Sequence, residues 1–476
     1  MSQLRSTPSL IRRAFAAIFS FETAFVLYLF AGFYKASDYL AWVPVDLTLV
    51  LLLVSLAAGG WVLWKRRFAS TRRAWLLVAA MAVFSTWVLL SLLWAPITRY
   101  GQEKALQFAV LNGWALAGAA LVLDGDKGRL TRFYGALLAL ALIFSLETMR
   151  VYLPHMDVRS YRVLGSAYQA IGRLVGLGFV VALAAFLSRG HRTWQRWAYL
   201  TLALLYFFVL LFVGARGPFI AAMLAMALVL ILARGQIRRK LLFLAALGVI
   251  YLVGSLWMGP SLRTMYRFNV ILAHEVGWEL PGAQPTPTLA PTPTPPPTPT
   301  PKVATTQPTA IAESRTPDAA AASPASPTPV QPKPTPRPRI PSPKEIPNKS
   351  VEMRQKGFVN AWRLWLRAPL FGAGVGSFAF YYPADQLRVY PHNMVLEILS
   401  ELGVVGVGLW LVLFWLALGG FIKRGGWRKP LAIVALGFLT FTLINAMISG
   451  DIASNRHVFT ALGLLVATGD LWMAES

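Results

Sequence analysis

Long, uninterrupted apolar stretches recur along most of the 476-residue chain, separated by polar connections. About 20 helical residues cross the hydrocarbon core of a bilayer, so runs of this length predict membrane spans. The runs are continuously apolar and do not alternate, which favours helices over the strands of a membrane barrel. We therefore expect an all-α, polytopic membrane protein with about 12 transmembrane helices. The predicted spans lie near residues 14–33, 45–63, 74–94, 105–123, 133–153, 168–187, 198–213, 218–233, 241–258, 404–421, 430–448 and 458–473.

One long interruption, residues 259–403, separates two groups of predicted spans. Its centre, about residues 285–347, is dominated by proline, threonine, alanine and serine, which have little apolar surface to bury and predict a disordered, extended tether. Residues 350–403 differ, because their aromatic and leucine residues predict a small ordered helical part that packs on the membrane domain. The expected organisation is nine spans over residues 1–258, one external loop over 259–403 and three spans over 404–476.

Basic residues are concentrated in every second connection between the predicted spans. The positive-inside rule places such connections in the cytoplasm, which predicts two cytoplasmic termini and an external position for residues 259–403. The basic connections contain Arg5, Arg12 and Arg13; Lys65, Arg66, Arg67, Arg72 and Arg73; Lys127, Arg129 and Arg132; Arg189, Arg192 and Arg196; Arg234, Arg238, Arg239 and Lys240; and Lys423, Arg424, Arg428 and Lys429. The other short connections contain only Lys35, Arg99, Lys104, Arg159, Arg162, Arg216 and Arg456.

Composition supports the membrane class. Only 14% of the residues are charged, whereas soluble domains usually carry about 25%. A net charge of +25 would suit nucleic acid, but the topology signal accounts for most of the basic clusters, so we predict no nucleic-acid partner. The chain has no cysteine, which excludes disulfides, thiolate nucleophiles and thiolate metal sites.

Arg216 is a first candidate for function, because external charges oppose the topology pattern. It stands in Gly214-Ala215-Arg216-Gly217-Pro218, a very short external turn between two spans. Glycine permits the tight turn, and Pro218 suits the first turn of the next helix. The guanidinium then lies near a helix N-terminus, where it suits a phosphate. A snorkelling arginine that contacts lipid headgroups is the alternative.

Two further arginines precede this turn. Arg162 lies in the preceding external loop, with Arg159, and Arg173 lies inside the next apolar run. A charge that faced lipid would be expensive, so Arg173 should face a partner or a watery cavity. Glu147 on the preceding span is one candidate partner, and a structural ion pair remains the alternative to a functional role.

The densest group of polar residues lies between Tyr390 and Gly403. Pro391 can open a helix, which would put His392 in the first turn, where the helix dipole lowers its pKa. A neutral histidine can act as a general base. Asn393, Glu397 and Glu401 follow at a spacing of four residues, on one helix face. A lone histidine is usually structural, but this one is external, beside a span and close to acids.

Two other patterns carry no site. Gly372-Ala373-Gly374-Val375-Gly376 is rich in glycine, but no strand surrounds it and it lies in the external loop, so it is a poor nucleotide-binding loop. His274-Glu275 lacks the second histidine of a zinc-protease helix, because Trp278 occupies that position. No carboxylate-rich metal site stands out, and we predict neither a metal nor a cofactor.

Several of these segments resemble the O-antigen ligase and polymerase family of lipid-linked glycan transferases. The similar stretches are Arg162-Val163-Leu164-Gly165, Gly214-Ala215-Arg216-Gly217, Arg354 through Pro369 to Gly376, and His392-Asn393-Met394-Val395-Leu396-Glu397 with Glu401-Leu402-Gly403-Val404-Val405-Gly406. The chain departs from the family pattern at Ala215, where serine is common, and at Tyr168-Gln169-Ala170, where an Asn-Pro-Asn-like stretch is common. The proline- and threonine-rich tether is not part of the family core.

The resemblance implies the architecture of a class C glycosyltransferase in the bacterial inner membrane. It also implies a donor glycan on undecaprenyl pyrophosphate and transfer with inversion, without a metal, outside that membrane. Arg162, Arg216 and Arg354 would then bind the pyrophosphate, and His392 would be the general base. Arg216 would also act in the transfer step, and Asn393, Glu397, Glu401 and Arg173 would support the site.

Two questions stay open at this stage. The acceptor could be a lipid, another glycan repeat unit or a protein hydroxyl. A transporter or flippase of lipid-linked sugars would also have many spans, although such a protein should show an internal repeat or paired broken helices, and no clear one is visible.

The charge pattern makes a topology prediction. A reporter fused at Lys302 should behave as external and one fused at Ser476 as cytoplasmic, because every second connection is basic. Alkaline phosphatase and green fluorescent protein fusions measure this directly. A fluorescent cytoplasmic reporter at Lys302 would contradict the whole arrangement.

Overall fold

The computed structural model describes residues 18–155, 162–188, 190–258, 345–383, 390–423 and 429–469. Residues 285–344 of the predicted tether lie outside the described residues, as do Arg159 and the His274-Glu275 pair.

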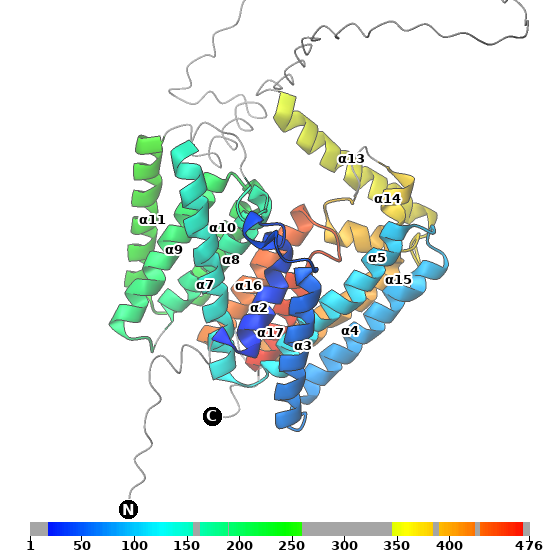
Figure 1. Cartoon of the computed structure of the whole chain (residues 1–476), viewed down its shortest axis with the longest axis horizontal. Helices are drawn as coiled ribbons and strands as arrows, with labels where there is room; N and C mark the ends of the chain where they lie inside the picture. Colours follow the sequence, from blue (N-terminus) through cyan, green and yellow to red (C-terminus); the bar gives the residue numbers. More distant parts are fainter. Residues whose placement is uncertain are drawn as a thin grey trace, which may run out of the picture.

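The described residues form a bundle of helices, with one isolated bridge between Val163 and Ser166 as the only strand-like pairing found among them (Figure 1). The α-helices are α2 (Phe21–Tyr34), α3 (Leu47–Lys65), α4 (Arg72–Leu90), α5 (Arg99–Gln107), α6 (Gly113–Ala117), α7 (Lys127–Tyr152), α8 (Tyr168–Leu187), α9 (Thr193–Val213), α10 (Arg216–Leu232), α11 (Ile237–Met258), α13 (Glu345–Arg367), α14 (Ser377–Tyr381), α15 (Met394–Lys423), α16 (Pro430–Ile448) and α17 (Arg456–Gly469). Shorter elements are the 3₁₀ turns η1 (Asp38–Leu40), η2 (Ser91–Leu93) and η5 (Leu153–His155) and the π-helical turns η3 (Phe108–Asn112) and η4 (Gly118–Val122).

Every predicted span overlaps one of these helices. Eight helical segments among the described residues are long and apolar enough to cross a membrane, and α2 and α10 are shorter apolar helices. A multi-pass, all-helical membrane protein is therefore the observed class, while the total of 12 spans stays a prediction. Several predicted edges are too late by five or six residues: the spans expected from residues 105, 133 and 198 begin at Arg99, Lys127 and Thr193. At the first of these, the Thr98 hydroxyl accepts a hydrogen bond from the Gly101 N–H at 3.0 Å and caps the helix.

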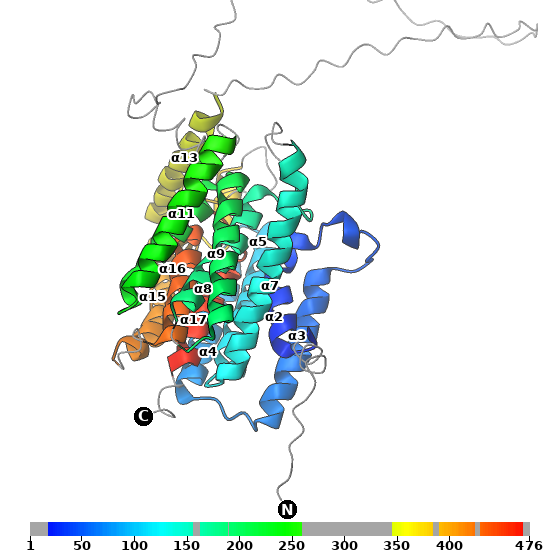
Figure 2. The same ribbon diagram turned by 90° about the vertical axis from the view of Figure 1, so that its left-hand side faces the viewer.

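The helix α8 lies at the centre of the bundle. In its most apolar stretch 83% of the residues are buried, compared with 22% in the same kind of stretch of α3, which lies at the periphery. Helix α8 packs against α7, α9, α10 and α16. Figure 2 shows α7, α9 and α16 around it. Small residues permit this close packing, since a side chain added at Gly176 would overlap the ring of Phe441 on α16. Arg173 lies on this central helix, so the close packing of α8 fixes the position of the Arg173 backbone.

The charge pattern separates along the bundle as expected. Two basic connections and the end of α17 meet at one end, where Arg66 donates to the carbonyl of Asp124 at 3.0 Å and the N–H of Gly125 donates to the carbonyl of Ala467 at 3.2 Å. The helix α13 and the turn before α10 lie at the opposite end of the bundle (Figure 1). Which of these ends faces the cytoplasm stays a prediction.

A break at Gly403 divides α15 into a short helix and the span that follows. Gly403 has φ 68° and ψ −168°, a backbone conformation that is almost exclusive to glycine. It meets Gly372, which also has positive φ, in a close approach of two backbones. A Cβ at Gly403 would lie 2.3 Å from the carbonyl oxygen of Leu370. The glycine-rich stretch from Gly372 to Gly376 is thus a packing element.

The break predicts a selective loss of stability. Gly403→Ala should destabilise the protein by roughly 1–3 kcal/mol or more, because alanine is strained at this φ and ψ and its Cβ meets the backbone of Leu370. Gly408→Ala in the same helix is the matched control, since nothing lies within 4 Å of its added Cβ. Thermal unfolding in detergent measures both, and equal melting temperatures would contradict the account.

Candidate functional site

His392 lies immediately before α15 in a left-handed backbone conformation, with φ 58°. The prediction that Pro391 opens the helix with His392 in its first turn is wrong. The helix begins at Met394, because the side-chain oxygen of Asn393 accepts a hydrogen bond from the N–H of Leu396 at 3.0 Å and caps it. Histidine tolerates positive φ better than most residues, but such strain gathers at functional sites.

The imidazole of His392 is largely enclosed. Its ring centroid lies 4.5 Å from that of Tyr390, and its Nδ1 atom is buried with no hydrogen-bond partner among the described residues. Burial lowers the pKa of His392 to about 4, helped by the positive charges of Arg354 and Arg173. The pKa is thus low as predicted, and burial is the largest cause, followed by the charges of the two arginines. His392 is neutral near pH 7 and can accept a proton.

The helix α13 covers this histidine. A Cβ at Gly357 would lie 3.5 Å from the backbone of Pro391, so α13 approaches the segment before α15 closely. Arg354 lies three residues earlier, on the same helix face. The positive charge of Arg354 therefore lies near His392 and lowers the pKa of its imidazole.

The carboxyl end of α16 joins three of the predicted segments. Arg173 donates from Nη2 to the carbonyl of Ser449 at 2.7 Å, and Asn393 donates from Nδ2 to the carbonyl of Met447 at 3.3 Å. A Cβ at Gly217 would lie 3.2 Å from the side chain of Ile448. The same end of α16 is therefore contacted by three parts of the chain: Arg173, the turn that carries Arg216 and the loop that carries His392.

The Arg216 turn forms as the sequence predicts. Gly214 ends α9 with φ 71°, and Arg216 is the first residue of α10, with the buried Pro218 in the first turn. Ala215 packs against Gly172, next to Arg173 in the chain, where an added Cβ would lie 2.7 Å from that of Ala215.

Two of the predicted relationships fail or find no support. Glu147 is not the partner of Arg173, because it pairs with Arg150 at 2.6 Å and accepts a hydrogen bond from Tyr39 at 3.3 Å. Arg162 is exposed on a tight turn that packs against the end of α2, where the hydroxyl of Ser166 donates to the carbonyl of Phe33.

Glu397 and Glu401 form a buried ion cluster with Lys104 of α5. The Lys104 ammonium lies 2.5 Å from Glu397 and 2.7 Å from Glu401, and none of the three side chains is more than 1% exposed. The second oxygen of Glu397 accepts the N–H of Ile452 at 3.0 Å, and Asn112 donates to the carbonyl of the same residue at 2.8 Å. The two acids therefore anchor the connection between α16 and α17 to α5 and α15.

The sequence reasoning did not assign Lys104 a role. The signal was present, because Lys104 lies in a connection that the charge pattern predicts to be external, at the edge of a span, and the two acids are four residues apart. The sequence does not show that Lys104 pairs with two acids nearly 300 positions later in the chain. Asp451 was also missed; it accepts a hydrogen bond from the Tyr100 hydroxyl at 3.2 Å and lies beside Ile452.

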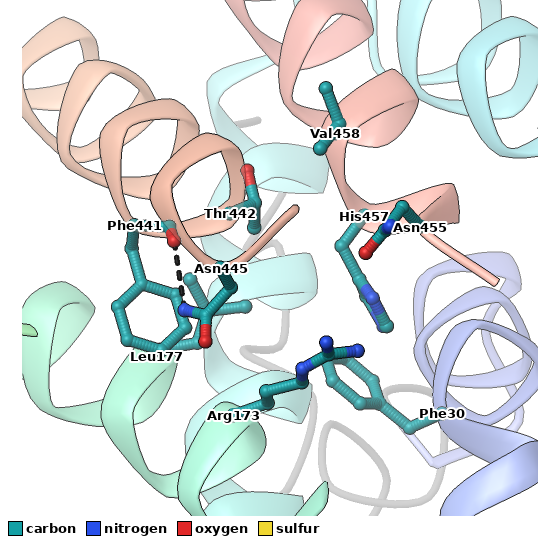
Figure 3. Close-up of a pocket in the computed structure, with 9 residues that line it drawn as sticks. All are labelled: Phe30, Arg173, Leu177, Phe441, Thr442, Asn445, Asn455, His457 and Val458. Atoms are coloured by element: carbon teal, nitrogen blue, oxygen red, sulfur yellow. Dashed lines mark hydrogen bonds between the residues drawn. The ribbon is translucent and has the colours of Figure 1, made fainter. Parts of the chain in front are cut away.

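A small cavity of about 20 Å³ lies between α2, α8, α16 and α17 (Figure 3). Arg173 points into it together with Asn445, Asn455 and His457, while Phe30 and Leu177 supply apolar wall (Figure 3). These groups are neutral apart from Arg173, so the lining as a whole is positive. No cluster of three or more histidine, aspartate or glutamate side chains suited to a metal occurs within the described ranges.

Comparison with known families gives one match. The model of the O-antigen ligase family matches residues 201–411, from α9 into α15. This stretch includes Arg216, Arg354, His392, Glu397 and Glu401, whereas Arg162, Arg173 and Lys104 precede it. No curated protein matches the chain.

The ion cluster predicts a large loss of stability on removal of its cation. Lys104→Met leaves two carboxylates buried without their partner, which typically costs roughly 3–5 kcal/mol. Adding Glu397→Gln and Glu401→Gln should recover part of this loss, because neutral amides do not need the ammonium. Lys35→Met is the control, since the pair that Lys35 forms with Asp46 is solvent-exposed and should matter little. Unfolding in detergent measures all three, and an unchanged Lys104→Met protein would refute the anchoring role.

Proposed function

From the O-antigen ligase and polymerase family that the match over residues 201–411 supports, we propose a specific transferase reaction. The protein moves a glycan from undecaprenyl pyrophosphate to an acceptor hydroxyl, with inversion and without a metal, on the external face of the inner membrane. The acceptor is a lipid, a glycan or a protein. The observation that carries the proposal is a neutral, enclosed His392 beside the two arginines Arg354 and Arg173.

The reaction is a single displacement. The acceptor oxygen attacks the anomeric carbon of the donor sugar from the face opposite the pyrophosphate. The bond between that carbon and the phosphate oxygen breaks, and its electron pair leaves with the pyrophosphate. The acceptor hydroxyl gives its proton to His392, whose imidazole is unprotonated near pH 7 because its pKa is about 4. Attack from the opposite face inverts the anomeric centre.

Arginines serve the other end of the displacement. The negative charge of the leaving pyrophosphate grows as the bond breaks, and preorganised cations in a site with little water stabilise it strongly. Arg216 contributes from the first turn of α10, where the backbone N–H groups also favour an anion. Arg354 contributes from α13, and Arg173 contributes from α8, close enough to His392 that its charge lowers the pKa of the imidazole. Arg162 keeps its proposed role in pyrophosphate binding on the strength of its motif alone.

Substitution separates the two roles. His392→Ala should still bind the lipid-linked donor but lose about 10²–10⁴ in transfer rate, the usual contribution of a general base. Arg216→Ala should lose donor binding as well as turnover, and Arg216→Lys should recover only part, because a point charge does not reproduce the guanidinium fork. In vitro transfer by the purified protein, with EDTA present, measures these effects. Near wild-type transfer by His392→Ala, or loss of wild-type activity with EDTA, would contradict the proposal.

The pH dependence tests the electrostatic setting of the base. Because the pKa of His392 is about 4, transfer should stay nearly constant from about pH 8 to pH 5 and fall only as the imidazole is protonated. Arg354→Gln removes a positive charge, so the pKa of His392 should rise and the acid limb should move to higher pH. Lys356→Gln is the matched control, an exposed cation on another face of α13. An acid limb that stays in place in Arg354→Gln would show that Arg354 does not act on His392.

A further inference from the structure

The helix α13 has three distinct faces. One face packs on the protein: Ala361 and Leu364 are buried with Phe378 of α14, and Gly357 approaches Pro391. The second face carries Phe358, Trp362 and Leu366, four residues apart, which are 37%, 49% and 59% exposed. The third carries the exposed cations Lys356, Arg363 and Arg367. Since α-helical residues four apart share a face, the apolar and basic residues form two separate stripes.

The apolar stripe continues onto the end of a membrane span. Beyond α13, Leu370 and Phe371 are also more than half exposed, and the ring of Phe371 packs against Trp87 and Trp94 with centroids 5.6 and 6.4 Å apart. Trp87 lies on α4, and Trp94 follows η2 at its end, where Leu93 and Ile97 are strongly exposed. Tryptophans at the end of a span lie at the level of the lipid headgroups. The apolar surface of α13 is therefore continuous with a surface that faces the bilayer.

A lipid surface fits both stripes at once. An interfacial helix buries its apolar face about 5–10 Å into the boundary between headgroups and acyl chains, and its basic residues attract anionic headgroups. In water, the helix would leave Phe358, Trp362 and Leu366 exposed beside three cations, and soluble surfaces avoid such contiguous apolar patches.

We propose that α13 lies in the outer headgroup region of the membrane, with Phe358, Trp362 and Leu366 inserted among the acyl chains and Lys356, Arg363 and Arg367 against anionic phospholipid headgroups. The helix then holds Arg354 over His392 from a position fixed by the bilayer. The inference concerns a membrane contact and does not rest on the proposed glycan transfer, so either can fail without the other.

The absence of cysteine makes the test direct, because each introduced cysteine is the sole labelling site in the full chain. Phe358→Cys, Trp362→Cys and Leu366→Cys are labelled with a nitroxide and placed in nanodiscs of phosphatidylethanolamine and phosphatidylglycerol. Lys356→Cys and Arg363→Cys are matched positions on the same helix, and Leu53→Cys, exposed on α3, is the lipid reference. Collision rates with oxygen, which concentrates in lipid, and with a water-soluble nickel chelate are measured by electron paramagnetic resonance.

The first three labels should favour oxygen over the nickel chelate, as the Leu53 label does, and the Lys356 and Arg363 labels should favour the chelate. In discs of phosphatidylcholine alone, the preference of the first three labels for oxygen should shrink, because the attraction to anionic headgroups is lost. Labels at all five positions that favour the chelate would show a water-exposed helix and overturn the proposal. Apolar-stripe labels shielded from both reagents would show a covering protein surface, such as a second copy, and would also overturn it.

Discussion

The ion cluster of Lys104 with Glu397 and Glu401 is the interaction on which the half of the bundle that carries the candidate site depends. Its three side chains are almost completely buried, and moving such charges out of water is costly unless each finds its partner at close range. The same arrangement gives hydrogen-bond partners to both backbone groups of Ile452: its N–H donates to Glu397, and its carbonyl accepts from Asn112. One constraint therefore fixes α5, α15 and the connection between α16 and α17 relative to each other.

The polar residues of the candidate site follow from that constraint. Once the connection after α16 is fixed, its carbonyl groups accept hydrogen bonds from Arg173 and Asn393, and Ile448 lies against the turn that carries Arg216. His392 then sits between Asn393 and Tyr390, with α13 above it. Arg354 lies on α13 and Arg173 on α8, and the positive charges of both lower the pKa of His392, so their proximity to one neutral histidine is a property of the fold and not of any single motif.

The sequence predicts the parts of this arrangement that depend on local pattern. The positions of the helices follow from apolar runs, the turn before α10 from glycine and proline, and the shared face of Glu397 and Glu401 from their spacing. It does not predict relationships between distant segments: the acids pair with Lys104, Arg173 bonds to Ser449 and not to Glu147, and the cause of the low pKa of His392 is burial beside two arginines. The start of α15 was misplaced because Asn393 competes with Pro391 as the signal for the helix start.

The central claim is that the neutral histidine and the converging arginines act on one lipid-linked pyrophosphate. An electron cryo-microscopy structure of the full chain in nanodiscs with an undecaprenyl-pyrophosphate glycan bound tests it most directly. The account predicts pyrophosphate oxygens within hydrogen-bond distance of Arg216 and of Arg354 or Arg173, with the anomeric carbon on the side that faces His392. A donor whose pyrophosphate is held elsewhere, or whose anomeric carbon is out of reach of an acceptor activated by His392, would contradict it.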